Sequence, residues 1–378
     1  MGSRGSFGSR FGVIAAVSGS VIGLGNIWRF PYVAGENGGA AFILIYIACS
    51  FLISIPLMLS EFSLGRSSKR NTKRAFQKLA PGTRWNYVGY MGIFCAFILL
   101  SFYCVIAGWA LEFIKESVLN EFAGKSAAQI SENFNGFIAS GWRPVVWMGV
   151  FMLSTAFIVW SGIEKGIERY TKIFMPVFIV LLAALAINSL TLPGAREGIG
   201  FLLRPDFSKI TGATILKAMG QSFFSMSLGL GCMITYGSYT GKEVNLVRST
   251  AMVCVFDTVV ALLAGLAIFP SVAHFDPSLL GSSKGVALMF IILPQVFESM
   301  GSVGQVVSFA FFVMVDIAAI TSVVSLIEVV TQFVIQKFHV HRKRAALVVA
   351  CVCFVVSIRS ATSPSSRSPA PRCSGSTG

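Results

Sequence analysis

The feature that most constrains this chain is a series of long apolar segments separated by short, basic loops. A helix needs roughly 20 apolar residues to cross a bilayer, and only 12% of the 378 residues are charged, against roughly 25% in soluble domains. The chain is therefore predicted to be an all-α polytopic membrane protein. A shorter apolar piece near 285–299 is predicted to be a re-entrant or surface helix. The predicted spans lie near 11–34, 40–64, 86–117, 144–162, 168–190, 212–239, 246–271, 304–337 and 345–358.

The net charge of +14 is distributed in a way that indicates membrane topology. Lys and Arg fill the loops after the second, fourth, sixth and eighth spans, which is the positive-inside pattern. This pattern predicts a cytoplasmic N-terminus and argues against nucleic-acid binding. No signal peptide is recognised, and the loop 118–143 has no cysteine and no N-glycosylation site. We therefore expect a bacterial inner membrane.

Two of the predicted spans contain clusters of helix breakers. The first reads SGSVIGLGNIWRFPY (18–32) and the second reads GQSFFSMSLGLG (220–231). In a helix interior a Gly costs about 1 kcal/mol and a Pro about 3 kcal/mol. Unwound backbone is tolerated at membrane depth only where protein or a water-filled cavity satisfies it, and paired breaks in two repeats are typical of secondary transporters. Gly-rich packing seams between helices are the alternative interpretation.

The residues around these breaks resemble the neurotransmitter:sodium symporters. SGSVIGLGNIWRFPY is followed by ENGGAAF (36–42), and the similarity continues through IPLMLSEFSLGR (55–66), FYCVIAGW (102–109), GQSFFSMSLGLGCMITYGSY (220–239), DTVVALLAGLAIFP (257–270) and AAITSVVSLIEVV (318–330). The resemblance implies the leucine-transporter fold of 5+5 inverted repeats, with broken helices one and six. It also implies the amino-acid transporter branch of the family.

The resemblance implies two sodium sites. Sodium one would use the Val21 carbonyl, the side chains of Asn26, Ser225 and Asp257, and the substrate carboxylate. Sodium two would use the carbonyls of Gly19, Ile22 and Ala318 and the hydroxyls of Thr321 and Ser322. Oxygen ligands suit a hard cation such as Na⁺. Asp257 supports the first site independently, because an Asp in mid-span is expected to have a functional partner.

The substrate would lie between the two breaks. The resemblance implies that its carboxylate meets the amides of Leu24 and Gly25 and the Tyr103 hydroxyl, and that its amino group faces Val21, Phe224 and Ser227. Gly23 occupies the position of an Asp in monoamine members, which favours an amino acid, and an apolar pocket favours a hydrophobic or aromatic one. The predicted substrate residues are Ser20, Val21, Gly23, Leu24, Gly25, Leu99, Tyr103, Phe224, Ser225, Ser227, Leu230, Ser322 and Leu326.

The gate and chloride positions depart from the family pattern. Arg29, Tyr103 and Phe224 would form the outer gate, but the acidic partner of Arg29 belongs to a tenth helix. Arg4 matches the inner-gate arginine of the family. Phe7 stands where the family usually has a Trp, and Gln336 stands where it usually has an Asp. Chloride-dependent members of the family have a Ser at the position of Ala261. Because that hydroxyl is absent and the negative charges of Asp257 and Glu61 would take the place of chloride, we predict that chloride is not required. Asp316 lies near the sodium-two residues, and no role is assigned to it.

The predicted organisation has four parts. Residues 1–10 form a cytoplasmic segment, 11–190 the first inverted repeat, 212–358 an incomplete second repeat, and 359–378 a Ser/Pro/Arg-rich tail. A frameshift or truncation within helix nine is expected there, with a natural disordered tail as the alternative. The last span would be about 21 Å long at 1.5 Å per residue.

Three classes of function fit a membrane protein with broken helices. The first is a sodium-coupled symporter that imports a hydrophobic or aromatic amino acid by alternating access. The second is a truncated, transport-incompetent protein that binds Na⁺ and amino acid without turnover, and the third is an ion channel, for which no repeated filter residues are found. An enzyme is not expected, because no cluster of metal ligands and no nucleophile–base motif is found. The expected partners are Na⁺, an amino acid and the lipid bilayer.

Overall fold

A computed structural model describes residues 7–280 and 285–362, and every regular element in these ranges is a helix. Arg4 and residues 363–378 of the predicted tail 359–378 lie outside the described residues, and residues 359–362 are the end of helix α16. The α-helices are α1 (Arg10–Val21), α2 (Phe30–Glu36), α3 (Ala40–Cys49), α4 (Ile55–Ser68), α5 (Thr72–Leu79), α6 (Asn86–Val118), α7 (Ala127–Ala139), α8 (Trp142–Trp160), α9 (Arg169–Leu190), α10 (Ala195–Leu203), α11 (Gly212–Ser225), α12 (Cys232–Gly237), α13 (Leu246–Phe275), α14 (Leu293–Ser299), α15 (Ser302–Phe338) and α16 (Arg342–Thr362).

Short helical segments of other pitch join or extend these helices. Four are π-helical and two are 3₁₀. They are η1 (Gly25–Arg29), η2 (Ser50–Ser54), η3 (Ile163–Glu168), η4 (Phe207–Lys209), η5 (Pro277–Leu279) and η6 (Leu288–Ile292). Because η2 continues α3 into α4, residues Ala40–Ser68 form a single span, as the sequence predicts. The short apolar piece predicted near 285–299 corresponds to η6 and α14.

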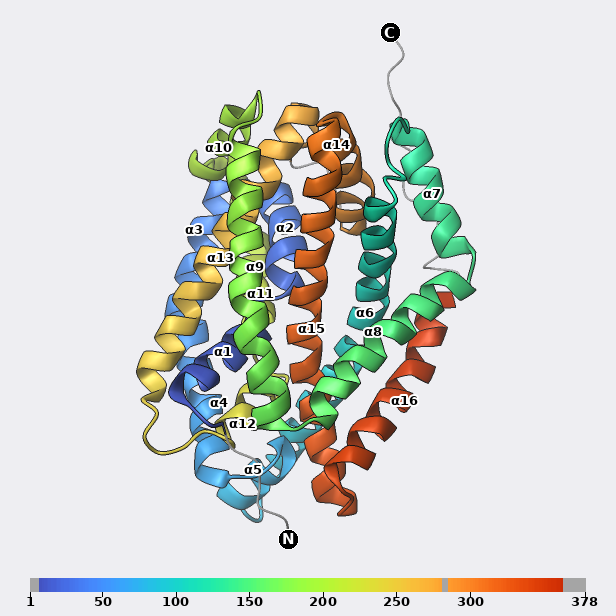
Figure 1. Ribbon diagram of the computed structural model, residues 1–378. Helices are drawn as coiled ribbons and strands as arrows, with labels where there is room; N and C mark the ends of the chain where they lie inside the picture. Colours follow the sequence, from blue (N-terminus) through green and yellow to red (C-terminus); the bar gives the residue numbers. More distant parts are fainter. Residues whose placement is uncertain (1–6, 281–284, 363–378) are drawn as a thin grey trace.

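The long helices α9, α13 and α15 run roughly parallel, and α8 and α16 are inclined to them (Figure 1). Within the described ranges, six helices are long and apolar enough to cross a membrane, and a seventh span results if the bent pair Phe11–Val21 and Gly25–Glu36 counts as one. The short helices α7, α10 and α14 lie at one end of the bundle, and α5 and α12 lie at the other (Figure 1). The two long helices α6 and α15 pack along each other in the core.

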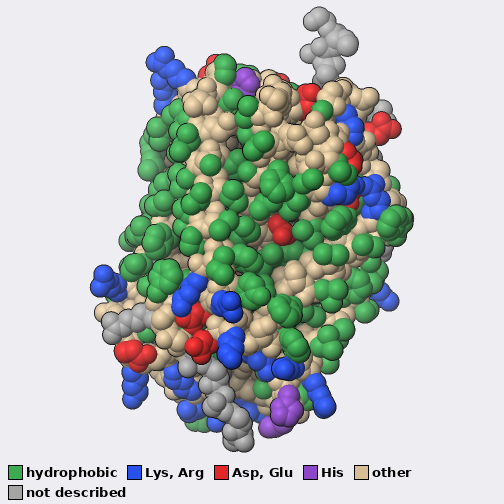
Figure 2. Space-filling view, in the orientation of Figure 1, with side chains coloured by type: hydrophobic (Ala, Val, Ile, Leu, Met, Phe, Trp, Pro, Cys, Tyr) green, Lys and Arg blue, Asp and Glu red, His purple; other side chains and the backbone are tan. Residues whose placement is uncertain are grey.

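The surface has the distribution of side chains expected of a membrane protein. A wide band of apolar side chains covers the middle of the molecule, and Lys and Arg gather mainly at the end near α5 and α12 (Figure 2). We call this the basic end; it includes Arg66, Lys69, Arg70, Lys242 and Arg344. Large apolar side chains of the predicted spans, such as Leu52 and Leu153, are exposed, as is normal where lipid is the solvent.

Candidate binding site between the two broken helices

The first break follows α1 directly. Ile22 has extended backbone angles, and the helix direction changes by 44° between Phe11–Val21 and Gly25–Glu36. The break can form there because Gly23 has no side chain: a Cβ on Gly23 would lie 2.0 Å from the Ser322 Oγ and 3.5 Å from the Ala318 carbonyl oxygen. The unwound residues of α1 are therefore pressed against the middle of α15.

The second break separates α11 from α12. Gly229 and Gly231 both have φ of +76°, a conformation that glycine adopts without steric cost. Ser227 also has a positive φ, +53°, which is uncommon for a residue with a side chain. Its hydroxyl donates a 2.9 Å hydrogen bond to the carbonyl oxygen of Ser20. The strained Ser227 thus joins the second break directly to the last turn of α1.

The side chains predicted to bind sodium one lie within hydrogen-bond distance of one another. Asp257, on α13, is fully buried, and its Oδ1 accepts hydrogen bonds of 2.7 Å from the Asn26 amide and 2.7 Å from the Ser225 hydroxyl. The Ser225 Oγ is also 3.4 Å from the Asn26 Oδ1. These carboxylate, amide and hydroxyl oxygens are a donor set that fits a hard cation.

The predicted sodium-two residues also lie together. A Cβ on Gly19 would be 3.3 Å from the Thr321 Cβ, so the last turn of α1 contacts α15 at this level. The Thr321 hydroxyl lies 3.1 Å from the Ala318 carbonyl oxygen, to which it donates a hydrogen bond. The structure therefore places Gly19 and Gly23 beside Ala318, Thr321 and Ser322 of α15.

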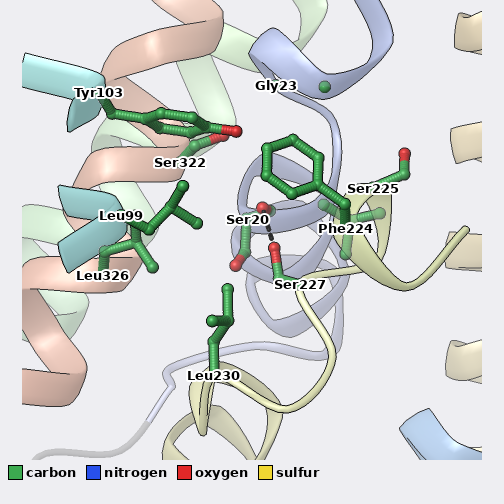
Figure 3. Close-up of a pocket in the computed structure, with 12 residues that line it drawn as sticks. Ser20, Gly23, Leu99, Tyr103, Phe224, Ser225, Ser227, Leu230, Ser322 and Leu326 are labelled. Carbon is green, nitrogen blue, oxygen red and sulfur yellow. Dashed lines mark hydrogen bonds between the residues drawn. The ribbon is translucent and has the colours of Figure 1, made fainter. Parts of the chain in front are cut away.

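A small cavity of about 10 Å³ lies between the breaks. Tyr103 and Leu99 reach it from α6, Ser322 and Leu326 from α15, and the Phe224 ring points across it toward Tyr103 (Figure 3). Leu24 is buried but does not line the cavity, and the other predicted substrate residues all do. The lining residues are Ser20, Val21, Gly23, Gly25, Leu99, Tyr103, Phe224, Ser225, Ser227, Leu230, Ser322 and Leu326.

Aromatic and cationic side chains cover the side of the cavity farther from the basic end. The Tyr103 and Phe224 rings meet edge to face with their centroids 6.2 Å apart. The Arg29 guanidinium carbon lies 4.8 Å from the Phe224 centroid, within the range of a cation–π contact. Arg29 also donates a 2.5 Å hydrogen bond to the Gln221 amide oxygen. In the described residues Arg29 therefore has a neutral partner rather than an acidic one.

At the basic end, the residues at the predicted inner gate differ from those usual in the family. Gln336 accepts a hydrogen bond from the Asn71 backbone N–H at 3.1 Å. Phe7 packs edge-on against Tyr236 and Tyr239. The ion pair nearby joins Arg342 of α16 to the fully buried Glu328 of α15, with N–O distances of 2.9 and 2.5 Å.

Several residues of the site were not anticipated from the sequence. Tyr46 donates a 2.6 Å hydrogen bond to the Asp257 Oδ2, and the Gln221 amide joins Arg29 to the Gly25 carbonyl. Ser50 and Ser54 have hydroxyls that lie 2.9 and 2.6 Å from the Ser222 hydroxyl beside the second break. Each is a polar residue in an otherwise apolar stretch, which is the signal that could have identified them. Glu61, which was named from the sequence in connection with chloride, lies at the second break. Its carboxylate accepts a 2.7 Å hydrogen bond from the Gly229 backbone N–H.

Comparison with known proteins gives one consistent result. The sequence profile of the sodium:neurotransmitter symporter family matches residues 4–136 and 117–365. An uncharacterised sodium-dependent transporter of Bacillus subtilis is 39% identical over 350 residues, which cover 93% of this chain and 77% of that protein. An uncharacterised sodium-dependent transporter of Haemophilus influenzae is 34% identical over 352 residues, 90% of this chain and 76% of its own length.

A solved structure gives the same answer for the fold. The crystal structure of MhsT in complex with L-phenylalanine superposes with a TM-score of 0.89 at 44% sequence identity, covering 96% of this chain and 81% of that one. The prediction of an all-helical polytopic membrane protein with the leucine-transporter fold is confirmed. Because the relatives of this chain are transporters, the prediction that the protein is not an enzyme is also confirmed. The chain belongs to the sodium:neurotransmitter symporter family.

Proposed function

We propose that this protein is a sodium-coupled symporter that imports a hydrophobic or aromatic amino acid by alternating access. The observation that carries the proposal is the Asp257 carboxylate, whose Oδ1 meets the Asn26 and Ser225 side chains where the two broken helices approach each other. An ionised carboxylate buried at membrane depth is expensive unless a cation or hydrogen-bond donors compensate it. A sodium ion at that point would link ion binding to the substrate cavity beside it.

The cavity chemistry supports the substrate class. Its side walls are mainly apolar and aromatic, from Leu99, Phe224, Leu230 and Leu326, while its backbone groups come from the unwound residues of α1. The N–H groups that begin a helix attract a carboxylate, and η1 begins at Gly25. An amino acid fits this division into a polar and an apolar half, and the L-phenylalanine bound to MhsT supports the choice of a ring-bearing one.

We further propose two sodium ions per substrate and no requirement for chloride. The two oxygen clusters at Asp257 and at Thr321 support the ion count. Asp257 carries a fixed charge beside the proposed sodium one, and Ala261, one turn further along α13, offers no hydroxyl. Replacing chloride by gluconate is expected to leave uptake unchanged; abolished uptake would reject this part.

The orientation and organisation are also part of the proposal. The concentration of Lys and Arg at the basic end supports a cytoplasmic location for that end in a bacterial inner membrane, with the N-terminus on the same side. Residues 11–190 and 212–358 would be the two repeats, each opening with a broken helix. A bundle of the first, second, sixth and seventh predicted spans would rock against the third, fourth, eighth and ninth around the fixed site.

The test is uptake by the full chain in proteoliposomes. Labelled phenylalanine is expected to accumulate under an inward sodium gradient, saturably, and not under a choline gradient. Asn26→Ala should shift the sodium dependence of uptake to higher concentrations, whereas Asn188→Ala, far from the cavity, should not. Sodium-dependent binding without uptake would replace the symporter by a protein that binds Na⁺ and amino acid without turnover, and sodium-independent conduction would replace it by a channel.

A further inference from the structure

A second polar cleft lies at the basic end, away from the substrate cavity. It is an open cleft of about 540 Å³ between α4 and the segment that joins α12 to α13. Its cations are Arg66 and Lys242, and its apolar wall is formed by Leu59 and Val247. None of these residues lines the substrate cavity.

The cationic groups of the cleft come from three separate elements. Arg66, on α4, is half-buried and donates a 2.8 Å hydrogen bond to the Val244 carbonyl oxygen, which fixes the joining segment against α4. A guanidinium has five N–H donors, so others are left for a ligand. Lys242 is exposed on the joining segment itself. The 30-residue helix α13 begins at the cleft, and a helix N-terminus carries a partial positive charge.

One acidic side chain opposes these cations. Glu243 is exposed and lines the same cleft. Its carboxylate is folded back over its own segment, because a Cβ on Gly241 would lie 1.9 Å from the Glu243 Oε1. The cleft therefore has two full positive charges, a helix N-terminus and a single negative charge, which favours an anion.

The side chains around the cleft indicate which class of anion the cleft would bind. Val247 is 61% exposed, and the outward faces of α4 and α13 carry further exposed apolar side chains, among them Leu57 and Val255. The cleft thus lies where the apolar band ends and the basic end begins, which is the depth of lipid headgroups. Positive-inside topology explains why cations lie at this end, but not why two of them share a cleft with an apolar wall.

We propose that this cleft binds the phosphate headgroup of an anionic phospholipid, whose acyl chains lie on the exposed apolar faces of α4 and α13. Basic pockets between membrane helices are a recurrent form of lipid recognition. The bound lipid would contact α4 and the segment that follows α12, so it would hold together two elements beside the second broken helix. The proposal does not depend on which substrate the protein transports.

The test measures lipid binding to the purified full chain in detergent. Labelled phosphatidylglycerol is expected to bind more tightly than phosphatidylcholine, and glycerol phosphate at equal concentration is expected not to displace it. Lys242→Ala should weaken binding about fivefold, and Glu243→Gln should strengthen it by a similar factor, because one charge near a lipid surface contributes about 1 kcal/mol. Raising the salt concentration should reduce both differences.

The matched control is Arg344→Ala, which removes one exposed charge at the same end of the molecule but outside the cleft. Equal weakening by Lys242→Ala and Arg344→Ala would show diffuse surface attraction and overturn the proposal, as would equal affinity for the two lipids. Displacement by glycerol phosphate would show a soluble phosphate site in place of the lipid site. Since binding is measured without transport, an absence of uptake would leave this result unaffected.

Discussion

The Tyr46 hydroxyl donates a 2.6 Å hydrogen bond to the Oδ2 of Asp257, the carboxylate whose other oxygen meets Asn26 and Ser225. Tyr46 lies on α3 and Asp257 on α13, so the bond joins two helices that are far apart in the sequence. Both side chains are buried. The carboxylate is therefore held from both sides, with Oδ1 directed at the proposed sodium site.

Tyr46→Phe is expected to raise the sodium concentration needed for half-maximal substrate binding by about tenfold or more. The reason is that a buried hydrogen bond to a charged group contributes about 1.5–3 kcal/mol, and without it the Oδ2 of Asp257 loses its hydrogen-bond donor. The measurement is a sodium titration of labelled phenylalanine binding. Tyr32→Phe, outside the cavity, serves as the control. An unchanged titration for Tyr46→Phe would show that Asp257 needs no such support.

Gly23→Ala is expected to reduce substrate and sodium binding by at least about tenfold. The new Cβ would lie 2.0 Å from the Ser322 Oγ, which would push that hydroxyl away from the proposed second sodium site. The matched control is Gly220→Ala on α11, where a Cβ meets nothing within 4 Å, and which should leave binding unchanged. If the two variants behaved alike, the close approach of α1 to α15 would not matter for binding.

The positions of the two breaks could be predicted from sequence, because backbone unwound by clustered glycines is tolerated at membrane depth only where protein or water satisfies it. The resemblance then named Leu99, Tyr103, Leu326 and others, and these residues do surround one cavity. Leu24 was named for its backbone amide and lies outside the lining.

Other features depend on packing that sequence does not reveal. Gln221 as the partner of Arg29, and Tyr46 as the partner of Asp257, follow only once α11, α3 and α13 are placed around α1. The positive φ of Ser227 is likewise not readable, since the residue type gives no sign of it. Pairing of Glu328 with Arg342 requires the turn between α15 and α16 to be known.

Asp316→Leu is expected to raise thermal stability. Asp316 lies within α15, and its Oδ1 is buried without a hydrogen-bond partner among the described residues. An Asp at the centre of a membrane helix costs about 2.5–3.5 kcal/mol on insertion scales, so replacing it by an apolar side chain removes an unfavourable group. Thermal unfolding in detergent checks this, with Val313→Leu on the same helix as control. A lower melting temperature, or loss of uptake at unchanged stability, would indicate a functional carboxylate.

Arg342→Ala is expected to destabilise the protein strongly, by about 3–5 kcal/mol, because it leaves the fully buried Glu328 carboxylate without its cation. The second variant, Arg342→Ala with Glu328→Gln, should recover most of that loss, since no buried charge then remains.

The exposed pair Lys209–Asp206, with 3.8 Å between its charged atoms, provides the comparison. Lys209→Ala should leave stability nearly unchanged, because water screens an exposed ion pair. The stability changes are measured by chemical or thermal unfolding of the unsubstituted protein, Arg342→Ala, the double variant and Lys209→Ala. If Arg342→Ala were as mild as Lys209→Ala, water would have to reach Glu328, and the contact between α15 and α16 at the basic end would be open rather than closed.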